Sequence, residues 1–427
     1  MDNSKFAEMI VGGRLRQHAD RIVEKSIAAV LPDSAVERAL EGVCFPGNVI
    51  LVAVGKAAWR MAHAAHGKLG SRISGGIVIT KYGHSLGPIG NLKMREAGHP
   101  VPDENSYRAT LEALELVNGL KEQDTVLFLL SGGGSALFEL PLIPAEELQE
   151  ITGQLLASGA GIVEINTIRK RLSAVKGGRF GRFCAPGKIF SVVLSDIVGD
   201  PLDMIASGPA VPDSSTCQAA WKIVQKFDLK LSEKVENCLN LETPKKLDNV
   251  TTRVTGSVGG LCAAAAEAAR ELGYEPHILT EELVCEAKDA GKMLAETASA
   301  HYGQGKMLAF IAGGETVVKV LGTGKGGRNQ ELALSAAAGI EGMEGVCIFS
   351  IGSDGTDGPT DAAGGYADGT TAEKLRRQGM EIDAVLKNND AYHALRSCGG
   401  LIITGPTGTN VNDVAVLLMT PVQQDEN

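Results

Sequence analysis

A serine- and glycine-rich turn follows a buried apolar segment near residue 130. Residues 125–130 (TVLFLL) are apolar or β-branched, which is typical of a strand buried on both faces of a sheet. The segment ends in five small residues, Ser131, Gly132, Gly133, Gly134 and Ser135. Glycine is expensive to order, and it is used where the backbone turns sharply or approaches a ligand. The turn has the hydroxyl and N–H groups of an anion cradle, although an ordinary strand-to-helix turn stays an alternative.

Lys56 follows another apolar segment in the same way. Residues 48–54 (NVILVAV) predict a strand, and Gly55-Lys56 precedes an alanine-rich helix. The amino terminus of a helix carries partial positive charge, so a lysine there is best tolerated when an anion lies with it. A solvated lysine that points away is the alternative.

Residues 322–331 (GTGKGGRNQE) combine glycines with two cations. The glycines match G-x-G-x-x-G, the dinucleotide fingerprint, at positions 322, 324 and 327. Lys325 and Arg328 argue against a dinucleotide, because such a loop holds its pyrophosphate mainly through backbone N–H groups. Cations are better suited to a phosphoryl group in transfer, whose charge must be compensated. No G-x-x-x-x-G-K-[ST] segment occurs, which excludes a P-loop kinase.

Several carboxylates lie beside glycines at predicted strand ends. They are Asp196 after residues 189–195, Glu315 after Gly313-Gly314, and Asp354 and Asp357 in GSDGTDG. Such carboxylates can hold Mg²⁺ through one or two oxygens or act as general bases. A helix cap or a local turn is the commoner use of Asp near Gly and stays open for each.

Alternating strands and helices must position these residues. In the first half, apolar strands at 48–54, 75–81, 125–130 and 189–195 alternate with helical segments, which predicts an α/β fold with a mostly parallel, doubly wound sheet. The sequence becomes polar from about 229 to 250, where we expect a domain boundary. In the second half, residues 306–321 predict a pair of strands, and residues 399–405 the final strand.

Composition excludes several classes of protein. The 427 residues are 44% hydrophobic but only 4% aromatic, and the net charge of −10 includes no basic block, which argues against a nucleic-acid partner. The eight cysteines are scattered without a CxxC pair, as in a reduced cytoplasmic protein. No apolar run reaches the ~18 residues of a membrane helix, so we expect no membrane partner.

Seven segments together resemble one family, the type II glycerate kinases. They are SGGGSALFELP, NTIRKRLSAVKGGR, LSDIVGDPLDMIASGP, GGETVV, GTGKGGRNQELAL, GSDGTDGPTDAAG and GPTGTNVND. The resemblance extends in order from about Val54 to Val414. It implies an N-terminal Rossmann-like domain, placed at 1–240, and a C-terminal domain named after a short motif (MOFRL), placed at 241–427. It further implies an active site in the cleft between the two domains.

The resemblance implies phosphorylation of D-glycerate by ATP and Mg²⁺, most often at the 2-hydroxyl. Family members have also been labelled hydroxypyruvate reductases. By the resemblance, Lys56 and Arg328 are catalytic, and the polar residues that line the cleft are Asp196, Glu315, Asp354 and Asn410.

These lines of argument meet in one hypothetical mechanism. The turn from Ser131 to Ser135 holds an anion, either ATP phosphates or the glycerate carboxylate, while Lys56 and Arg328 neutralise the transferring phosphoryl group. Asp196 positions or deprotonates the attacking hydroxyl. Asp354 and Glu315 are candidates for Mg²⁺, and the remaining ligand-binding candidates are Lys325, Gly326, Gly327 and Asn410.

Three alternatives remain on sequence alone. A glycerate 3-kinase would differ only in substrate placement. An NAD(P)H-dependent reductase would use the glycines of 322–327, and a non-catalytic sensor would need fewer charges at strand ends. The sequence leaves the oligomeric state open, with a homodimer among the options.

Overall fold

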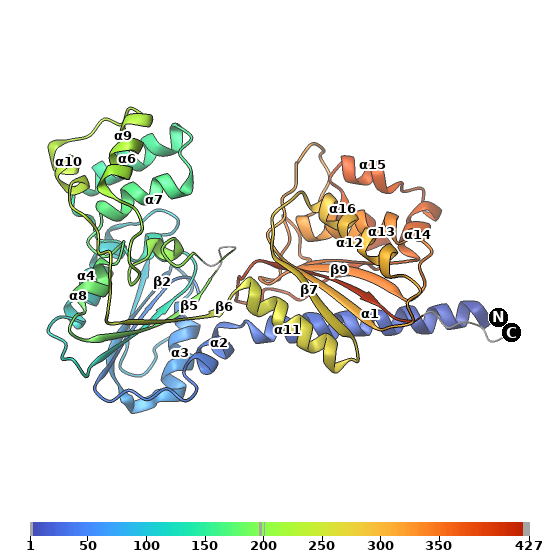
Figure 1. The fold of residues 1–427 in the computed structure, drawn as a ribbon, viewed down its shortest axis with the longest axis horizontal. Coiled ribbons are helices and arrows are strands. Elements are labelled where there is room, and N and C mark those ends of the chain that lie inside the picture. Colours follow the sequence, from blue (N-terminus) through green and yellow to red (C-terminus); the bar gives the residue numbers. More distant parts are fainter. Residues whose placement is uncertain (1–2, 196–198, 200, 422–427) are drawn as a thin grey trace. The chain divides into compact units, whose positions relative to one another are not determined.

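The computed structural model describes residues 3–195, 199 and 201–421, and the chain divides into two compact units (Figure 1). The first, here called the N-terminal unit, comprises Pro32–Asp196 and Asp200–Thr255. The second, the C-terminal unit, comprises Met1–Leu31, Ile197–Gly199 and Gly256–Asn427. Each unit has its own sheet and is described by itself.

The N-terminal unit is built on a six-stranded sheet in the order β3-β2-β1-β4-β5-β6. The four pairs from β3 to β5 are parallel. Strands β2 and β3 are added in turn on one side of β1. The chain then crosses over, and β4 pairs with the other side of β1. The direction in which strands are added therefore reverses between β1 and β4. In open α/β sheets, ligands bind at the carboxyl ends of strands at such a reversal. The strands are Val49–Val54, Ile73–Lys81, Lys93–Ala97, Thr125–Leu130, Lys188–Leu194 and Val250–Gly256.

Helices cover both faces of this sheet, which confirms the doubly wound architecture. Helices α2 (Pro32–Ala39) and α3 (Ala58–Leu69) share a core with Leu51, Ala53 and Leu127. Phe128 of β4 points to the opposite face, where it contacts Phe138 and Phe180. The helices there are α4 (Glu104–Leu116), α5 (Gly134–Leu137) and α8 (Arg179–Phe183). A separate cluster of helices has its own core and consists of α6 (Ala145–Ala157), α7 (Ile162–Arg171), α9 (Cys217–Lys226) and α10 (Glu233–Leu239) (Figure 1).

The C-terminal unit contains a mixed sheet in the order β11-β10-β9-β12-β8-β7. Only β7 and β8 pair in parallel; the other four pairs are antiparallel. The central strand β12 begins at Asp413, opposite Gly314 at the end of β8 and Gly352 at the end of β9. The strands are Glu275–Leu283, Leu308–Gly314, Val346–Gly352, Gly364–Asp368, Leu401–Ile402 and Asp413–Met419.

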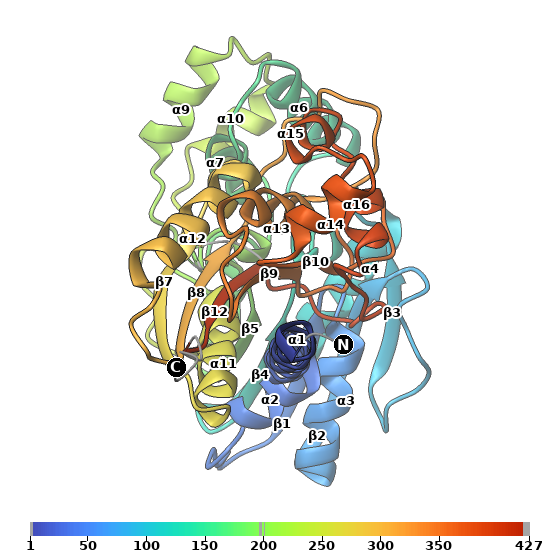
Figure 2. The same ribbon diagram turned by 90° about the vertical axis from the view of Figure 1, so that its right-hand side faces the viewer.

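Two helix layers enclose the mixed sheet. One layer is α1 (Asn3–Ala29) and α11 (Val258–Glu271), whose buried residues share a core with β8, β9 and β12 (Figure 2 shows α1 end-on). The other layer includes α12 (Ala287–His301) and α13 (Arg328–Gly339). The short helices α14 (Thr371–Arg377), α15 (Ile382–Lys387) and α16 (Ala391–Ser397) adjoin α13. The 3₁₀ turns are Gly70–Arg72 and Ile205–Ser207, both in the N-terminal unit.

Several elements differ from the sequence-based prediction. The predicted strand pair 306–321 is wrong, because only Leu308–Gly314 forms a strand and the chain then leaves the sheet at Gly314, whose φ is +154°. The basic segment of residues 166–180, which we expect from sequence to be helical, is not one helix, because α7 ends at Arg171 and α8 begins at Arg179. The strand at 399–405 is only Leu401–Ile402, and it is followed by the unpredicted β12.

The compact units also divide the chain differently from the predicted ranges 1–240 and 241–427. Residues 1–31 belong with the C-terminal unit, because Leu15, Ala19 and Ile22 are buried against α11 and its sheet. The chain changes unit between Thr255 and Gly256, after the polar segment of residues 229–250 in which we expect the boundary. The predicted cleft between domains stays a prediction.

Candidate functional site

Two turns meet where the strand order of the N-terminal unit reverses. The Lys56 N–H donates to the carbonyl of Gly132 over 2.9 Å, and the Ala57 N–H donates to Ser131 Oγ over 3.1 Å. Gly55 has φ +124°, and a Cβ there would lie 2.2 Å from Ser131 Oγ. Only glycine fits this approach, so the turn after β1 and the turn after β4 form one structure that carries Lys56.

Gly133, in the same structure, lies close to two side chains from other segments. Its φ is +88°, and a Cβ built on it would lie 3.0 Å from His99 Cδ2 and 3.3 Å from Lys56 Cγ. His99 and the stem of Lys56 therefore both lie over this glycine. The Lys56 carbonyl also accepts a hydrogen bond from His84 Nδ1 over 3.2 Å. Among the residues that the structure describes, no carboxylate forms an ion pair with Lys56.

The five predicted residues of the Ser131–Ser135 turn have different environments. Ser131 and Gly134 are buried, and Gly134 packs against Ala206, where a Cβ would come within 2.7 Å. Gly132, Gly133 and Ser135 are half-buried. Ser135 Oγ lies 3.1 Å from the Ser207 hydroxyl, and its carbonyl accepts from Arg169. The partly open face of the turn is thus formed by its middle glycines and Ser135.

A second group of polar residues lies in the C-terminal unit where β8, β9 and β12 meet. Arg328, the first residue of α13, donates to both carboxylate oxygens of Asp413 and to Glu315 Oε1 over 3.1 Å. Burial raises the pKa of the Asp413 carboxyl to about 6, and Arg328 offsets part of that rise. Burial would lower the pKa of Arg328, but its hydrogen bonds and the charges of Asp413 and Glu315 outweigh burial and raise it. The guanidinium is therefore a fixed cation in a defined orientation.

Two loops beside this ion pair carry the remaining predicted residues. Asp354 lies next to Asp413, since the Oδ1 atoms of both would be within 3.4 Å of a Cβ on Gly352. One Asp354 oxygen accepts the Thr356 N–H in a local turn. Asn410 is exposed and accepts the N–H of Asn412, whose side chain donates to Glu315 Oε2 over 3.1 Å. Glu315, Arg328, Asp354 and Asn410 thus come together, with Asp413 and Asn412 added by the structure.

The structure gives the glycines of 322–327 an internal role. A Cβ on Gly322 or Gly324 would collide with the backbone of Asn388, and one on Gly327 would lie 2.2 Å from the Asp357 carboxyl carbon. Asp357 accepts the N–H groups of Asn329 and Gln330, so it caps α13 and fills the position that a pyrophosphate would need. These contacts support the rejection of the dinucleotide interpretation.

Lys325 has partners of its own in Asp390 and Tyr392. Its N–H donates to Asp390 over 2.9 Å, and its ammonium lies 4.5 Å from the centre of the Tyr392 ring. Gly326 and Gly327 pack against Ala391 and Asp357. The structure assigns these residues packing contacts, and their predicted ligand contacts stay predictions.

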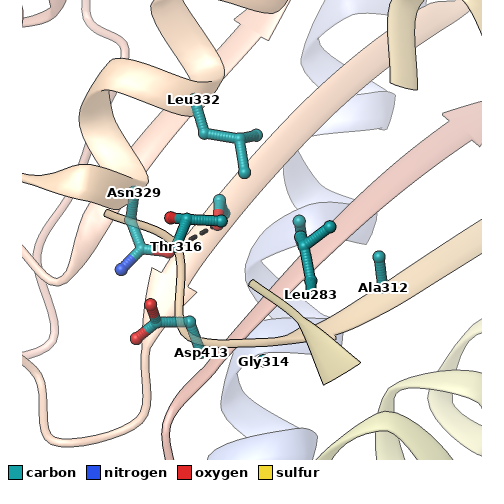
Figure 3. A pocket seen from close by; sticks show the side chains of 9 residues that line it. Leu283, Ala312, Gly314, Thr316, Asn329, Leu332 and Asp413 are labelled. Atoms are coloured by element: carbon teal, nitrogen blue, oxygen red, sulfur yellow. Dashed lines mark hydrogen bonds between the residues drawn. The ribbon is translucent and has the colours of Figure 1, made fainter. Parts of the chain in front are cut away.

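Figure 3 shows the side chains that line a small cavity, among them Asp413, Asn329 and Thr316. Asn329 is tied to Ser350 by a hydrogen bond of 2.5 Å, and Leu283 and Leu332 close the apolar side. Its volume of about 10 Å³ is enough for one water molecule at most. It is too small for a substrate.

Comparison with known proteins identifies the family of this chain. A domain family of unknown function (DUF4147) matches residues 18–240, and the MOFRL family matches residues 308–413. The chain is 55% identical to a D-glycerate 2-kinase of Thermotoga maritima, over 95% of this chain and 98% of that enzyme. It is 42% identical to a glycerate 2-kinase of Pyrococcus horikoshii, over 95% and 98% of the two chains. The crystal structure of a Thermotoga maritima glycerate kinase matches with a TM-score of 0.91 at 54% identity, covering 96% of this chain and all of that one.

The chain belongs to the type II glycerate kinases. The family and enzyme class expected from the seven motifs are thereby confirmed. Within this glycerate kinase, the predicted general base Asp196 lies outside the described residues. Over residues 3–195, 199 and 201–421, no group of three His, Cys, Asp or Glu side chains could hold a metal ion, and no helix is long and apolar enough to cross a membrane.

Sequence reasoning missed four residues of this kinase that lie at the two candidate surfaces. His84 and His99 lie beside Lys56, and Asn412 and Asp413 lie beside Arg328. The signal for Asp413 was present, because it is the last residue of the quoted GPTGTNVND segment and directly precedes an apolar run. His99, which directly precedes Pro100, carried no such signal.

Proposed function

We propose that the chain transfers the γ-phosphoryl group of ATP to the 2-hydroxyl of D-glycerate. The observation that carries this proposal is the 55% identity to a D-glycerate 2-kinase across 98% of that enzyme. The two groups of residues built around Lys56 and Arg328 fit the chemistry, since phosphoryl transfer requires fixed positive charge more than covalent catalysis.

Each surface would have a distinct task. Lys56 and the glycines of the Ser131–Ser135 turn, which the hydrogen bond from the Lys56 N–H to the Gly132 carbonyl joins, would bind an anionic oxygen group. Arg328, already oriented by Asp413, would stabilise charge on the phosphoryl group in the transition state. Asp196 would receive or orient the proton of the attacking hydroxyl.

Mg²⁺ would enter as a partner of ATP, supplying charge neutralisation on the phosphates. This metal keeps several waters and needs only one or two protein carboxylates. Of the two predicted ligands, Asp354 fits better, because Glu315 already accepts from Arg328 and Asn412. We further propose a cytoplasmic location and no nucleic-acid partner, and a homodimer stays an open option.

A coupled assay tests the function and the position of phosphorylation. The purified chain is given D-glycerate, ATP and Mg²⁺, and the product is detected through enolase with and without phosphoglycerate mutase. We expect signal without the mutase, because enolase consumes 2-phosphoglycerate directly. Signal only with the mutase would identify a 3-kinase, and ADP formation that does not depend on D-glycerate would reject both. A parallel reaction with NADH and hydroxypyruvate checks the reductase alternative.

A further inference from the structure

The surface around Lys56 contains more basic side chains than the proposed mechanism uses. His99 lies over Gly133 on one side of the turn, and His84 donates from Nδ1 to the Lys56 carbonyl. Because a carbonyl can only accept, the His84 proton is on Nδ1, and Nε2 is left for another partner. Lys81 ends the neighbouring strand β2. The lysines and histidines come from different connections but meet beside one turn.

The electrostatics of His99 indicate a missing anion. Partial burial lowers the pKa of His99, and the charges of Lys56, Lys81 and His84 lower it further. The nearest described carboxylate on the same connection, Asp103, caps α4 and accepts from Tyr82 and Ser106. It also accepts the N–H of Gly98, the residue before His99. Glu96 accepts the N–H groups of Gly83 and Ser85, on either side of His84, but among the described residues no carboxylate forms an ion pair with Lys56, Lys81 or His99. A ligand oxygen placed between Lys56 and His99 would supply that direct partner.

We propose that His99 is a further binding residue, which with Lys56 holds a negatively charged oxygen group of the substrate over Gly133. The proposal rests on the proposed function, since the oxygen group belongs to D-glycerate or to ATP. Carboxylate and phosphate share the chemistry that this cluster recognises. His99 is mostly neutral in the free protein at neutral pH, so binding of the anion draws a proton from solvent onto its ring and makes it a charged donor.

Gly133 is what allows this arrangement. A side chain there would occupy the space in which the His99 ring and the Lys56 stem lie, and the left-handed backbone further disfavours it. The glycine therefore brings both side chains over the same backbone surface. An ordinary turn would not require glycine at this position, so the arrangement explains why glycine stands at the centre of the SGGGS segment.

Calorimetric titration of the full-length protein tests the proposal. D-Glycerate and ADP are titrated separately, between pH 6.0 and 8.0, in two buffers of different ionisation enthalpy. For one ligand we expect uptake of up to one proton and an affinity that falls as pH rises, at most about tenfold per pH unit. His99→Gln should remove the uptake and weaken that ligand about tenfold at pH 6.5, the loss of one charge-assisted hydrogen bond. The ligand that responds identifies the bound group as carboxylate or phosphate.

His63→Gln is the matched control, because His63 is exposed on α3 and stacks on Trp59 away from the turn. It should keep both the affinity and the proton uptake. A second measurement needs no variant at this site: the His99 ring signal in the proton NMR spectrum of the wild type should titrate at higher pH when the ligand is bound. Unchanged proton uptake in His99→Gln, or a His99 signal indifferent to both ligands, overturns the proposal.

The two proposals fail differently. If the wild type binds D-glycerate or ADP with His99-dependent proton uptake but forms no phosphoglycerate, the proposed function is wrong and the anion site stands. If phosphoglycerate forms and His99→Gln retains wild-type binding of both ligands, the function stands and the role of His99 is wrong.

Discussion

Arg328 has two tasks that require the same geometry. Its planar guanidinium donates to both oxygens of Asp413, which fixes its orientation, and a further nitrogen donates to Glu315. A cation fixed before the reaction needs no reorganisation when charge develops in the transition state. A lysine could provide the charge but not the two-oxygen contact with Asp413. The orientation of Arg328 therefore depends on its carboxylate partner.

Asp413→Asn should lower kcat by about 10- to 100-fold, because loss of the charge leaves Arg328 free to shift. The KM values should change less, since Asp413 is buried and acts through Arg328. Steady-state kinetics on the folded variant check this expectation. Asp383→Asn, an exposed change in the same unit, is the control and should keep wild-type kcat. A variant at Asp413 with unchanged kcat would reject the positioning role.

At the scale of elements, a buried charge network holds α7 against the Ser131–Ser135 turn. Lys176 is fully buried and donates to Glu139 Oε2 over 2.6 Å. Arg169 of α7 lies 3.6 Å from the same carboxylate and donates to the Ser135 carbonyl. The basic segment NTIRKRLSAVK thus has structural ion pairs, and Glu139 is the anion that several cations share.

Glu139→Gln should destabilise the protein by about 3–5 kcal/mol, because the Lys176 ammonium is then buried without its partner. The double variant Glu139→Gln, Lys176→Met should recover at least half of that loss. Urea unfolding measures both. A small effect of the single variant, or no recovery in the double, would contradict the assignment of a shared buried charge.

The pH dependence of stability has a definite sign at Lys176. Burial lowers its pKa to about 8 in the folded chain, against 10.5 as the ordinary value. The unfolded chain therefore binds more protons between these pH values, and the wild type should gain stability from this group as pH rises from 8 to 10.5. In Lys176→Met this contribution should be absent.

Most elements were predictable from sequence because buried strands have a strong local signal. The runs that became β1, β4 and β5 are mostly apolar, and each was located to within one or two residues. Strand pairing is not local. That β4 lies beside β1, and so brings Ser131 to Lys56, depends on a crossover that no residue spacing encodes.

Glycines show a second limit of sequence reasoning. Gly133 and Gly327 look alike in sequence, since each lies in a turn next to polar residues. Gly133 lies under His99 and Lys56, whereas Gly327 makes room for Asp357 of its own chain. Whether a glycine approaches a ligand or another part of the protein is decided by tertiary structure. His99 and Asp413 likewise became candidate site residues only through tertiary contacts, with Gly133 and Lys56 in one case and with Arg328 in the other.

At the scale of the whole molecule, the first 31 residues belong with the last 172. Ile22 of α1 is fully buried in the core formed with α11, β8, β9 and β12. Val36 of α2, only a short distance along the chain, is fully buried in the core of the N-terminal unit with α3 and β1. Substitutions at these two positions, which are close in sequence, should therefore disturb different units, so each variant serves as the control for the other.

Ile22→Ala and Val36→Ala should each remove about 1–5 kcal/mol, because each leaves a cavity in a close-packed core. Hydrogen exchange followed by mass spectrometry separates their effects. Ile22→Ala should accelerate exchange in β8, β9 and β12 and spare β1 and β4, and Val36→Ala should do the reverse, because domains with separate cores open as separate cooperative units. If either variant accelerated exchange equally in both sheets, the chain would unfold as one cooperative body. A bound substrate would then slow exchange in both sheets together, and not only in the sheet that it contacts.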